Sequence, residues 1–587
     1  MKFLLPSIWL LLLFPGSALS SAFEFDTVEF REDTSLKSVT NTRIAGSHVK
    51  IHMPNLPYIA SAHAINGSLV RPADNERGWE YYMATSHKQI TPTLYEFSLR
   101  QGVRFQDGTP FNADSVVLNI EHYQKQPYTF SRMHIVLDRA EKIDDYTVRF
   151  HLKEEYGLMM YDAIWLLFYS PAYLEKFGWN GKPFCPNLAE AGPYGLGPYI
   201  LKEGYIEGDR RTPTAELVRN PYYWDPNSPK VDRITIIMDI SSAEATELTL
   251  NTEGNIDITP IAFGDVMGTI FSPYGKLMRR ASNNNYLARF NLFTGHPIFR
   301  EVEVRAAINR AIDQQLLAAL SMNGEGKPTY VSLSERFYGV KESMARLPAP
   351  RKESSLNKQV QAEIIAVIDK YKPKYGFEEE EQVPLIILAQ ESPLFLLKDI
   401  KYFLEQVNID VTLEVVSDES EMFANNLAAI RGENARAFDI VLWPNFDWIR
   451  HPWSSFFIFH SETGWSTFEP GSDDVMDQHI KRFFATSSSD PHYIQVLADL
   501  SYHIYQQNYV LHLPTPHATF ALNKEVVFTP SVSAIYPLWD IQVSDLHWSV
   551  RQGEYPSEHL VPIAIQDPRE VDHGPKLESA ALSPPLP

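Results

Sequence analysis

The sequence contains one cysteine in 587 residues, and this scarcity excludes several classes of protein. Cys185 has no second cysteine with which to form an intramolecular disulfide, so a small disulfide-held secreted scaffold is excluded. Zinc or redox sites built on a Cys-x-x-Cys pair are excluded for the same reason. Histidines and carboxylates are therefore the side chains left for any metal site. Cys185 itself lies among apolar neighbours and is expected to be inert.

Positive charge is also scarce. The chain carries 52 Lys and Arg residues against 73 Asp and Glu residues, which gives a formal net charge of −21 and a pI near 5.3. Nucleic acids and anionic membrane surfaces are bound through basic patches, and the sequence contains no long Lys/Arg run. We therefore expect no nucleic-acid partner. At about 100–200 residues per domain, the length allows about three or four structural units.

Long apolar runs are absent after the start of the chain. Met1-Lys2 is followed by an almost unbroken apolar run, Phe3–Phe14, and then by a Pro-Gly break and small residues. This order is typical of a secretory signal peptide, here residues 1–20, with cleavage after Ser20 or Ala22. A membrane anchor is the alternative, but the run is shorter than the roughly 20 residues that span a bilayer. Because no cysteine follows for a lipid anchor, we expect a soluble periplasmic protein.

Catalytic signatures are missing as well. The sequence contains no GxSxG elbow, no HExxH motif and no P-loop, and Gly195–Ile200 lacks the third glycine of a dinucleotide-binding motif. The carboxylate pair Asp473-Asp474 lies in a Gly/Ser-rich stretch that is typical of a turn or a helix cap. We therefore expect no enzyme. The alternatives from other classes are a periplasmic hydrolase and a receptor that reports its ligand to a sensor partner.

Strand-like and helix-like segments alternate irregularly, which indicates an α/β fold. Residues 93–123 predict a hairpin-like strand pair and then a helix capped by Asn112 or Asp114. Helical spacing of apolar residues across 301–320 predicts one amphipathic helix packed on a core. Residues 384–416 predict a βαβ unit, with a helix over 394–407.

Two segments have the composition of solvated chain. The acidic run Glu378–Glu381 predicts an exposed loop or linker rather than a cation site. Residues 555–587 are rich in proline, serine and charge and contain few aromatics. They predict an extended or disordered tail.

Four stretches carry a family resemblance, in the same order along the chain: LRQGVRFQDGTPFNADSVV, then GLGPYILKEGYIEGDRRTPTAELVRNPYYWDPNSPKVDRITI with GNIDI, then REVEVRAAINRAID, and last FDIVLWPNFDWIRHPWSSFF with YVLHLPTPHATFALNKEV. Together they resemble the extracytoplasmic solute-binding proteins of peptide-type ABC importers, solute-binding protein family 5. Members of this family bind oligopeptides, dipeptides, murein peptides, nickel chelates, opines or oligosaccharides. The resemblance therefore defines the class of protein better than the ligand.

The resemblance implies the two-lobed periplasmic binding protein fold. A large lobe I would hold residues 21–285 and 514–554, a smaller lobe II would hold 286–513, and crossing strands would form the hinge. Ligand binding in the cleft would close the lobes. The closed form would then meet the ABC permease, whose ATPase is a separate subunit. We expect a monomer without a cofactor.

The candidate ligand-binding segment follows a strand predicted over 438–442. It holds three tryptophans and three polar or charged side chains, namely Trp443, Asp447, Trp448, Arg450, His451 and Trp453. In peptide-binding members an Asp follows the Trp by three residues and pairs with the α-amino group, whereas here Asp447 follows by four and Phe446 holds the expected position. Arg450 with His451 favours a carboxylate. The alternative is that the tryptophans pack between the lobes and Arg450 lies in solvent.

The first cleft segment of the N-terminal lobe adds Tyr58 and Asn66 as candidate ligand residues, with His63 between them. Nickel-chelate binders grip carboxylates with arginines and sometimes add a histidine, and the nearest histidines besides His451 are His460, His512 and His517. A lone histidine is more often structural, so we assign no metal site. The interpretation we adopt is a peptide-like ligand, with a metal chelate or an opine-like acid as the alternative.

Overall fold

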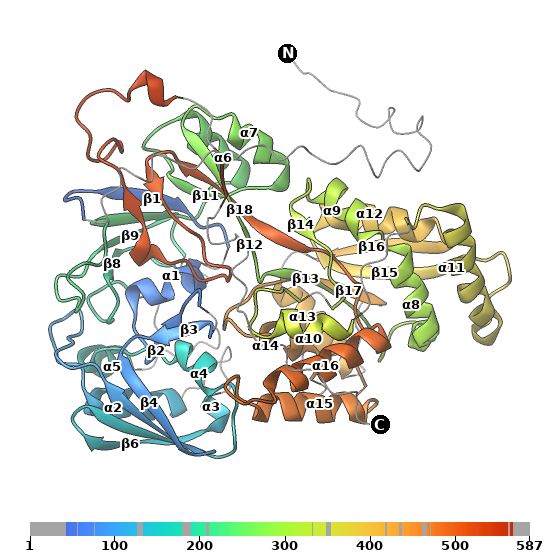
Figure 1. The fold of residues 1–587 in the computed structure, drawn as a ribbon, viewed down its shortest axis with the longest axis horizontal. Helices are drawn as coiled ribbons and strands as arrows, with labels where there is room; N and C mark the ends of the chain where they lie inside the picture. The colour runs from blue at the N-terminus through green and yellow to red at the C-terminus, as the bar shows by residue number, and fades with distance from the viewer. Residues whose placement is uncertain are drawn as a thin grey trace.

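A computed structural model describes residues 43–560 and 564–566, apart from 56, 76, 126–132, 179–189, 207–210, 332, 348–353, 392, 417–418, 432, 434–436, 461–465 and 470. The expected signal peptide and Cys185 lie outside the described residues. Helices and strands alternate along the described chain, which confirms the predicted α/β class (Figure 1). No helix in these ranges combines the length and the apolar character that a membrane span requires.

The largest sheet joins strands from both ends of the described chain. Its members are β1 (His48–His52), β8 (Tyr199–Glu203), β9 (Thr214–Arg219), β10 (Arg233–Ile237), β11 (Ile258–Pro260), β12 (Gly275–Ala281), β14 (Gly326–Lys327), β18 (Thr515–Asn523) and β21 (Ala564–Gln566). The order is β21-β12-β18-β11-β1-β10-β9-β8, and β14 pairs with β18 outside this path. Alternate residues of β1, Val49 and Ile51, are fully buried, as the period of two in a strand requires.

A second sheet lies in the N-terminal part of the chain. Its strands are β4 (Ala84–Thr91), β5 (Leu94–Leu99), β6 (Leu137–Asp144) and β7 (Thr147–Leu152), in the antiparallel order β4-β5-β7-β6. The predicted helix follows as α2 (Ala113–Lys125), and Asn112 caps it by accepting a hydrogen bond from Ser115 N at 3.1 Å. The predicted hairpin is wrong. Strand β5 pairs with β4 and β7, and the segment after it forms only the bridge between Arg104 and Pro110.

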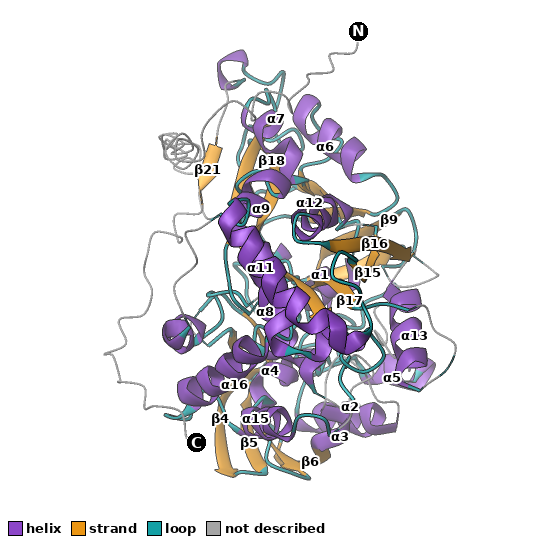
Figure 2. Cartoon of the chain, turned by 90° about the vertical axis from the view of Figure 1, so that its right-hand side faces the viewer, coloured by secondary structure: helices purple, strands orange, loops and turns teal. Residues whose placement is uncertain are grey.

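The third sheet has the order β13-β17-β15-β16. Its strands are β13 (Asn285–Phe290), β15 (Val383–Gln390), β16 (Ile409–Val416) and β17 (Ile440–Asn445). Helices α8 (Val302–Ala311), α11 (Lys358–Tyr371) and α12 (Leu394–Glu405) bury one face of this sheet, and Figure 2 shows α11 and α8 in front of its strands. Strands β15 and β16 are parallel and are joined by α12, so the predicted βαβ unit is confirmed. The acidic run before β15 is an exposed loop, also as predicted.

The single helix predicted over 301–320 is two helices, α8 and α9 (Gln314–Ser321). Ile312 between them has an extended backbone, and the carboxylate of Asp313 accepts a hydrogen bond from Leu316 N at 3.0 Å as the cap of α9. The apolar spacing continues across this break, because both helices bury one face in the same core. Asp313 as a helix cap is the local signal that the periodicity obscured.

Helices α15 (Asp474–Ala485) and α16 (Tyr493–Gln507) follow the third sheet in sequence but reach the N-terminal part of the chain in space. Gly157 N donates to Phe484 O at 2.7 Å, and a Cβ on Gly157 would lie 2.4 Å from the carbonyl carbon of Thr486. The shorter elements are α1 (Pro57–Ile65), β2 (Val70–Pro72), β3 (Trp79–Tyr81), α3 (Met133–Val136), α4 (Met159–Asp162), α5 (Pro171–Phe177), α6 (Ser242–Asn251), α7 (Val266–Ile270), α10 (Val340–Ser343), α13 (Glu419–Ile430), α14 (Trp453–Phe456), β19 (Val526–Val527) and β20 (Gln542–Val543).

Two links join the largest sheet to the segment that carries the third sheet, and within that segment β14 also pairs with β18 of the largest sheet. Residues 282–284 join β12 to β13, and residues 508–514 lead from α16 to β18. The two links lie near the boundaries expected at 285/286 and 513/514, and the division into lobes stays a prediction. Within the tail expected to be extended or disordered, residues 564–566 form the extended strand β21, which pairs in parallel with β12. Residues 567–587 lie outside the described residues.

Candidate functional site

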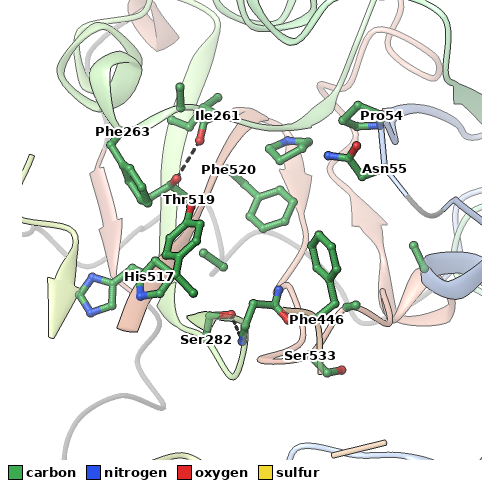
Figure 3. Close-up of a pocket in the computed structure, with 18 of the residues that line it drawn as sticks. Pro54, Asn55, Ile261, Phe263, Ser282, Phe446, His517, Thr519, Phe520 and Ser533 are labelled. Atoms are coloured by element: carbon green, nitrogen blue, oxygen red, sulfur yellow. Dashed lines mark hydrogen bonds between the residues drawn. The ribbon is translucent and has the colours of Figure 1, made fainter. Parts of the chain in front are cut away.

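A cavity of about 540 Å³ lies where the largest sheet meets the third sheet. Its size falls in the range of small-molecule sites. The wall residues come from β11, β18, the 282–284 link, β13, the ends of α9 and α12, and the loop 531–536, so both sheets contribute (Figure 3). The wall is formed by Pro54, Asn55, Ala60, Pro260, Ile261, Ala262, Phe263, Gly264, Ser282, Asn284, Tyr286, Ser321, Phe395, Phe446, Pro516, His517, Ala518, Thr519, Phe520, Ser531, Ser533, Ala534 and Tyr536.

Aromatic rings make much of this wall. Phe395 contacts Phe263 and Tyr286 edge to face, with ring centroids 5.9 and 6.1 Å apart. On the side of the largest sheet, Phe520 contacts Tyr536 with centroids 5.6 Å apart. Burial raises the pKa of Tyr286 to about 12, so its hydroxyl stays neutral near pH 7. Such rings stack on flat or apolar groups of a ligand.

The hydroxyl groups of the wall are mostly engaged by the protein. Thr519 Oγ1 donates to Ile261 O at 2.9 Å, and Ser282 Oγ accepts from Asn284 N at 3.0 Å (Figure 3). Asn284 Oδ1 accepts from Asp447 N at 2.9 Å. Among the described residues, the hydrogen bond of the Asn284 side chain is made by its oxygen and not by Nδ2. The amide of Asn284 can therefore donate to a ligand.

One wall residue, His517, carries an imidazole ring, and this ring already has a carboxylate partner. Its Nδ1 lies 2.7 Å from Glu325 Oε2, and Arg279 Nη1 donates to Glu325 Oε1 at 2.9 Å. Burial acts to raise the pKa of Glu325, but the hydrogen bond from His517 and the charge of Arg279 outweigh burial and hold that pKa below its usual value. Each carboxylate oxygen of Glu325 is therefore already bonded to another residue of the protein.

The strand predicted over 438–442 is β17, and it continues to Asn445. Trp443 is therefore a strand residue, paired with Leu287 of β13, and the loop begins at Phe446. Asp447 is fully buried, and it accepts from Asn283 Nδ2 at 2.8 Å and from Arg450 N at 2.8 Å. Phe446 lines the cavity and Asp447 does not, so the two consecutive side chains lie on different sides of the loop.

Arg450 is buried rather than solvated. Its backbone is left-handed, with φ of 58°, and its side chain is 5% exposed. Its Nη2 lies 3.0 Å from Asp74 Oδ1 and donates to Ala73 O at 3.1 Å. The other carboxylate oxygen of Asp74 accepts from Arg280 Nη1 at 2.5 Å. Asp74, Arg280 and Arg450 form a triad that joins the β2–β3 loop, β12 and the loop after β17.

The histidine and the tryptophans of the segment also belong to the core. His451 Nδ1 accepts from Trp453 N at 3.2 Å and its Nε2 lies 2.9 Å from Tyr493 Oη, so both ring nitrogens are engaged. Burial lowers the pKa of His451 to about 3. The ring of Trp453 lies 4.0 Å from Phe484, and the backbone oxygen of Trp448 accepts from an indole. Trp443 and Trp453 are thus buried, and Trp448 packs partly buried against the same core.

The N-terminal candidates lie on or beside α1. Asn66 is buried, and its Oδ1 lies 2.5 Å from the position of a Cβ on Gly195. Tyr58 packs against the main core, and His63 is buried 5.6 Å from the ring of Trp165. The eight predicted ligand residues therefore lie outside the described cavity wall, and ligand contact by them stays a prediction.

Of the four histidines considered as metal ligands, His517 alone lines the cavity. The described residues contain no group of three or more His, Cys, Asp and Glu placed to hold a metal ion. Sequence reasoning missed the serines, the asparagines and most aromatic residues of the wall. The one signal was Phe446, which stands where an aspartate was expected.

Comparison with known proteins finds a matching family profile and a curated relative. Residues 79–467 match the profile described as bacterial extracellular solute-binding proteins, family 5 middle. The glutathione-binding protein GsiB of Escherichia coli K12 is 26% identical over 242 residues, which are 40% of this chain and 43% of GsiB. The chain thus spans less than half the length of this curated relative.

Two solved structures share the fold. NikA from Brucella suis in complex with Fe(III)-EDTA has a TM-score of 0.69 at 17% identity, covering 84% of this chain and 99% of NikA. The murein tripeptide binding protein MppA of Escherichia coli has a TM-score of 0.66 at 15% identity, covering 86% of this chain and 99% of MppA. These likenesses confirm the predicted two-lobed fold of periplasmic binding proteins.

Proposed function

We propose, because the chain belongs to the bacterial extracellular solute-binding proteins of family 5, that it captures a peptide-like small solute in the cavity between its sheets. Members of this family are the solute-binding components of ABC importers. The observation that carries the proposal is the position of the cavity. Its wall combines residues of both sheets with Ser282 and Asn284 of the 282–284 link, so a ligand there contacts both parts of the chain at once.

Delivery by hinge closure follows from this position. A solute that contacts both sheets stabilises the arrangement in which they are close, and the links 282–284 and 508–514 are where the backbone would bend. We propose lobe I as residues 21–285 and 514–554 and lobe II as residues 286–513. The closed form would then be recognised by the permease, and the ATPase subunit would supply the energy.

The peptide-like class is supported by the relatives and by the wall. GsiB is named for glutathione and MppA for a murein tripeptide. The amide of Asn284 and the aromatic rings suit amide groups and side chains of a short peptide. Carboxylate-rich chelates and opine-like acids would need a cation, and the described wall contains no Lys or Arg. We propose that the segment 443–453 serves the site through Phe446 and through its support of the wall.

Three further elements of the proposal concern the whole protein. It is secreted through a cleaved signal peptide of residues 1–20, it works in the periplasm, and it is a monomer. N-terminal sequencing of the protein released by osmotic shock should give Ser21 or Phe23. Recovery of Met1 would contradict secretion with cleavage.

The function is tested by identifying what the protein holds. Mass spectrometry of gently isolated protein should detect a small solute bound one to one, and small-angle scattering should show that the stripped protein becomes more compact when this solute is returned. Unchanged scattering at saturation would contradict hinge closure. Conversion of the solute by the pure protein would favour the hydrolase instead.

A further inference from the structure

The wall of the cavity carries almost no charge. Its 23 residues include no Asp, Glu, Lys or Arg, and its one histidine, His517, is held by Glu325. The described wall therefore presents rings, small hydroxyls and amides to a ligand. A solute that brought a full charge into this space would lose its hydration without gaining a counter-ion.

Charged groups do lie behind the wall, but each is bonded to other groups of the protein. Asp74 is held by Arg280 and Arg450, and Ser531 of the wall stands 3.5 Å from its carboxylate. Asp399 accepts from Ser321 Oγ at 2.5 Å. The groups of the triad are paired with one another, and Asp399 is covered by a wall hydroxyl.

Asp447 is the remaining carboxylate near the wall. It follows Phe446 directly, yet it is fully buried and bonded to Asn283 and to two backbone N–H groups of its own loop. The side chain of Phe446 takes the place at the wall instead. A free α-ammonium group in the cavity would therefore meet an aromatic ring where a carboxylate would have been needed.

From this arrangement we infer that the part of the solute that enters the cavity is uncharged, as in a peptide with masked ends or a neutral saccharide, and that it is held by stacking and by amide hydrogen bonds. This inference rests on the proposed function and narrows its ligand class. Aromatic faces and amide donors are the groups that bind neutral polar ligands of this kind.

The test compares probes that differ in charge. Titration calorimetry at pH 7 would use the tripeptide Ala-Phe-Ala with free ends, its acetylated and amidated form, the neutral trisaccharide cellotriose, and the anionic chelate Fe(III)-EDTA. We expect the blocked peptide to bind at least tenfold more tightly than the free peptide, and the chelate to bind more weakly than the neutral probes. Tighter binding of the free peptide or of the chelate would overturn the inference and leave the proposed capture of a solute intact.

Two other outcomes separate the proposals. Binding of cellotriose without either peptide would overturn the peptide-like class but support the uncharged ligand. Binding of none of the four probes would count against both.

A wall variant supplies the matched control. Asn55 is an exposed wall residue with no hydrogen bond to a described residue, and Figure 3 places its amide at the edge of the cavity. Asn55→Asp adds a carboxylate of the same shape, so it should raise the affinity for the free peptide relative to the blocked one by threefold or more. Asn55→Gln, which adds no charge, should leave that ratio unchanged. An unchanged ratio in Asn55→Asp would contradict the inference, because the charge of the wall would then not govern selection.

Discussion

The loop after β17 and the cavity beside it differ in what their residues do. The loop holds Asp447, Arg450 and His451, whose chemistry is that of ligand-binding sites, yet each is buried and bonded to other parts of the protein. The cavity wall consists mostly of aromatic, small and amide residues, which attract little notice in a sequence. The comparison teaches that in this chain the charged groups of the loop hold the framework, while the described cavity wall contains no Asp, Glu, Lys or Arg.

The largest effect is expected from the triad of Asp74, Arg280 and Arg450. Asp74→Asn leaves two buried guanidinium groups without a carboxylate, so we expect the free energy of unfolding to fall by about 3–5 kcal/mol. Urea unfolding at pH 7 measures this loss. Asp138→Asn is the matched control, because Asp138 and Arg139 form an exposed pair that should contribute about 0–1 kcal/mol. Equal losses in the two variants would contradict the structural role of the triad. Arg450 would then be available to bind an anionic ligand.

The next effect concerns the free energy of unfolding at acidic pH. The pKa of His451 is about 3 in the folded protein against 6.5 ordinarily, so below pH 6.5 the unfolded chain binds a proton that the folded protein refuses. The stability that the neutral ring contributes is therefore complete above about pH 6.5. It should be lost at about 1.4 kcal/mol per pH unit as the pH falls towards 3. Urea unfolding between pH 6.5 and 4.5 measures the slope.

His63 offers the matched variant for that slope, because burial lowers its pKa to about 3 as well. Neither ring nitrogen of His63 has a partner, so His63→Phe should reduce the slope by one proton without lowering stability at pH 7. His451→Phe should reduce the slope equally but cost about 1–3 kcal/mol at pH 7, because Tyr493 and the backbone of Trp453 lose their partner. A slope that neither variant changes would mean that these rings titrate normally.

Sequence patterns predicted the framework better than the site. The βαβ unit at 383–416 follows from apolar strands and a periodic helix, because burial fixes both patterns. The break at Asp313 was missed because the same core buries residues on both sides of it. The resemblance of four sequence stretches also predicted the family, whose match covers more than half of the chain.

The residues of the site were harder to predict, because the direction of each side chain decides whether it lines the cavity. Strand β17 ends at Asn445, so the alternation of a strand no longer fixes the directions of Phe446 and Asp447. The loop buries Asp447 and places Phe446 at the cavity wall. The ionisable residues of the loop, which suggested a ligand site in the sequence, are buried in the structure. Residues such as Ser282 and Tyr536 come from distant parts of the chain, and only the fold brings them to one wall.

The smallest effect on stability is expected from a change at Phe446. The same change gives the most direct test of the difference between the loop and the cavity wall. Phe446 is partly exposed and lines the cavity, so Phe446→Ala should change the free energy of unfolding by less than about 1 kcal/mol while it removes a ring that a solute would cover. Loss of that contact should weaken binding of the acetylated and amidated Ala-Phe-Ala peptide by about 10-fold, or about 1.4 kcal/mol, in titration calorimetry. Phe271→Ala is the control, since Phe271 is 66% exposed and outside the wall, and it should leave affinity unchanged.

Asp447→Ala should show the reverse pattern, with lost stability and little change in the affinity of molecules that remain folded. If Asp447→Ala weakened binding more than Phe446→Ala did, the carboxylate would face the solute after all, and the division between a charged framework and a neutral wall would fail.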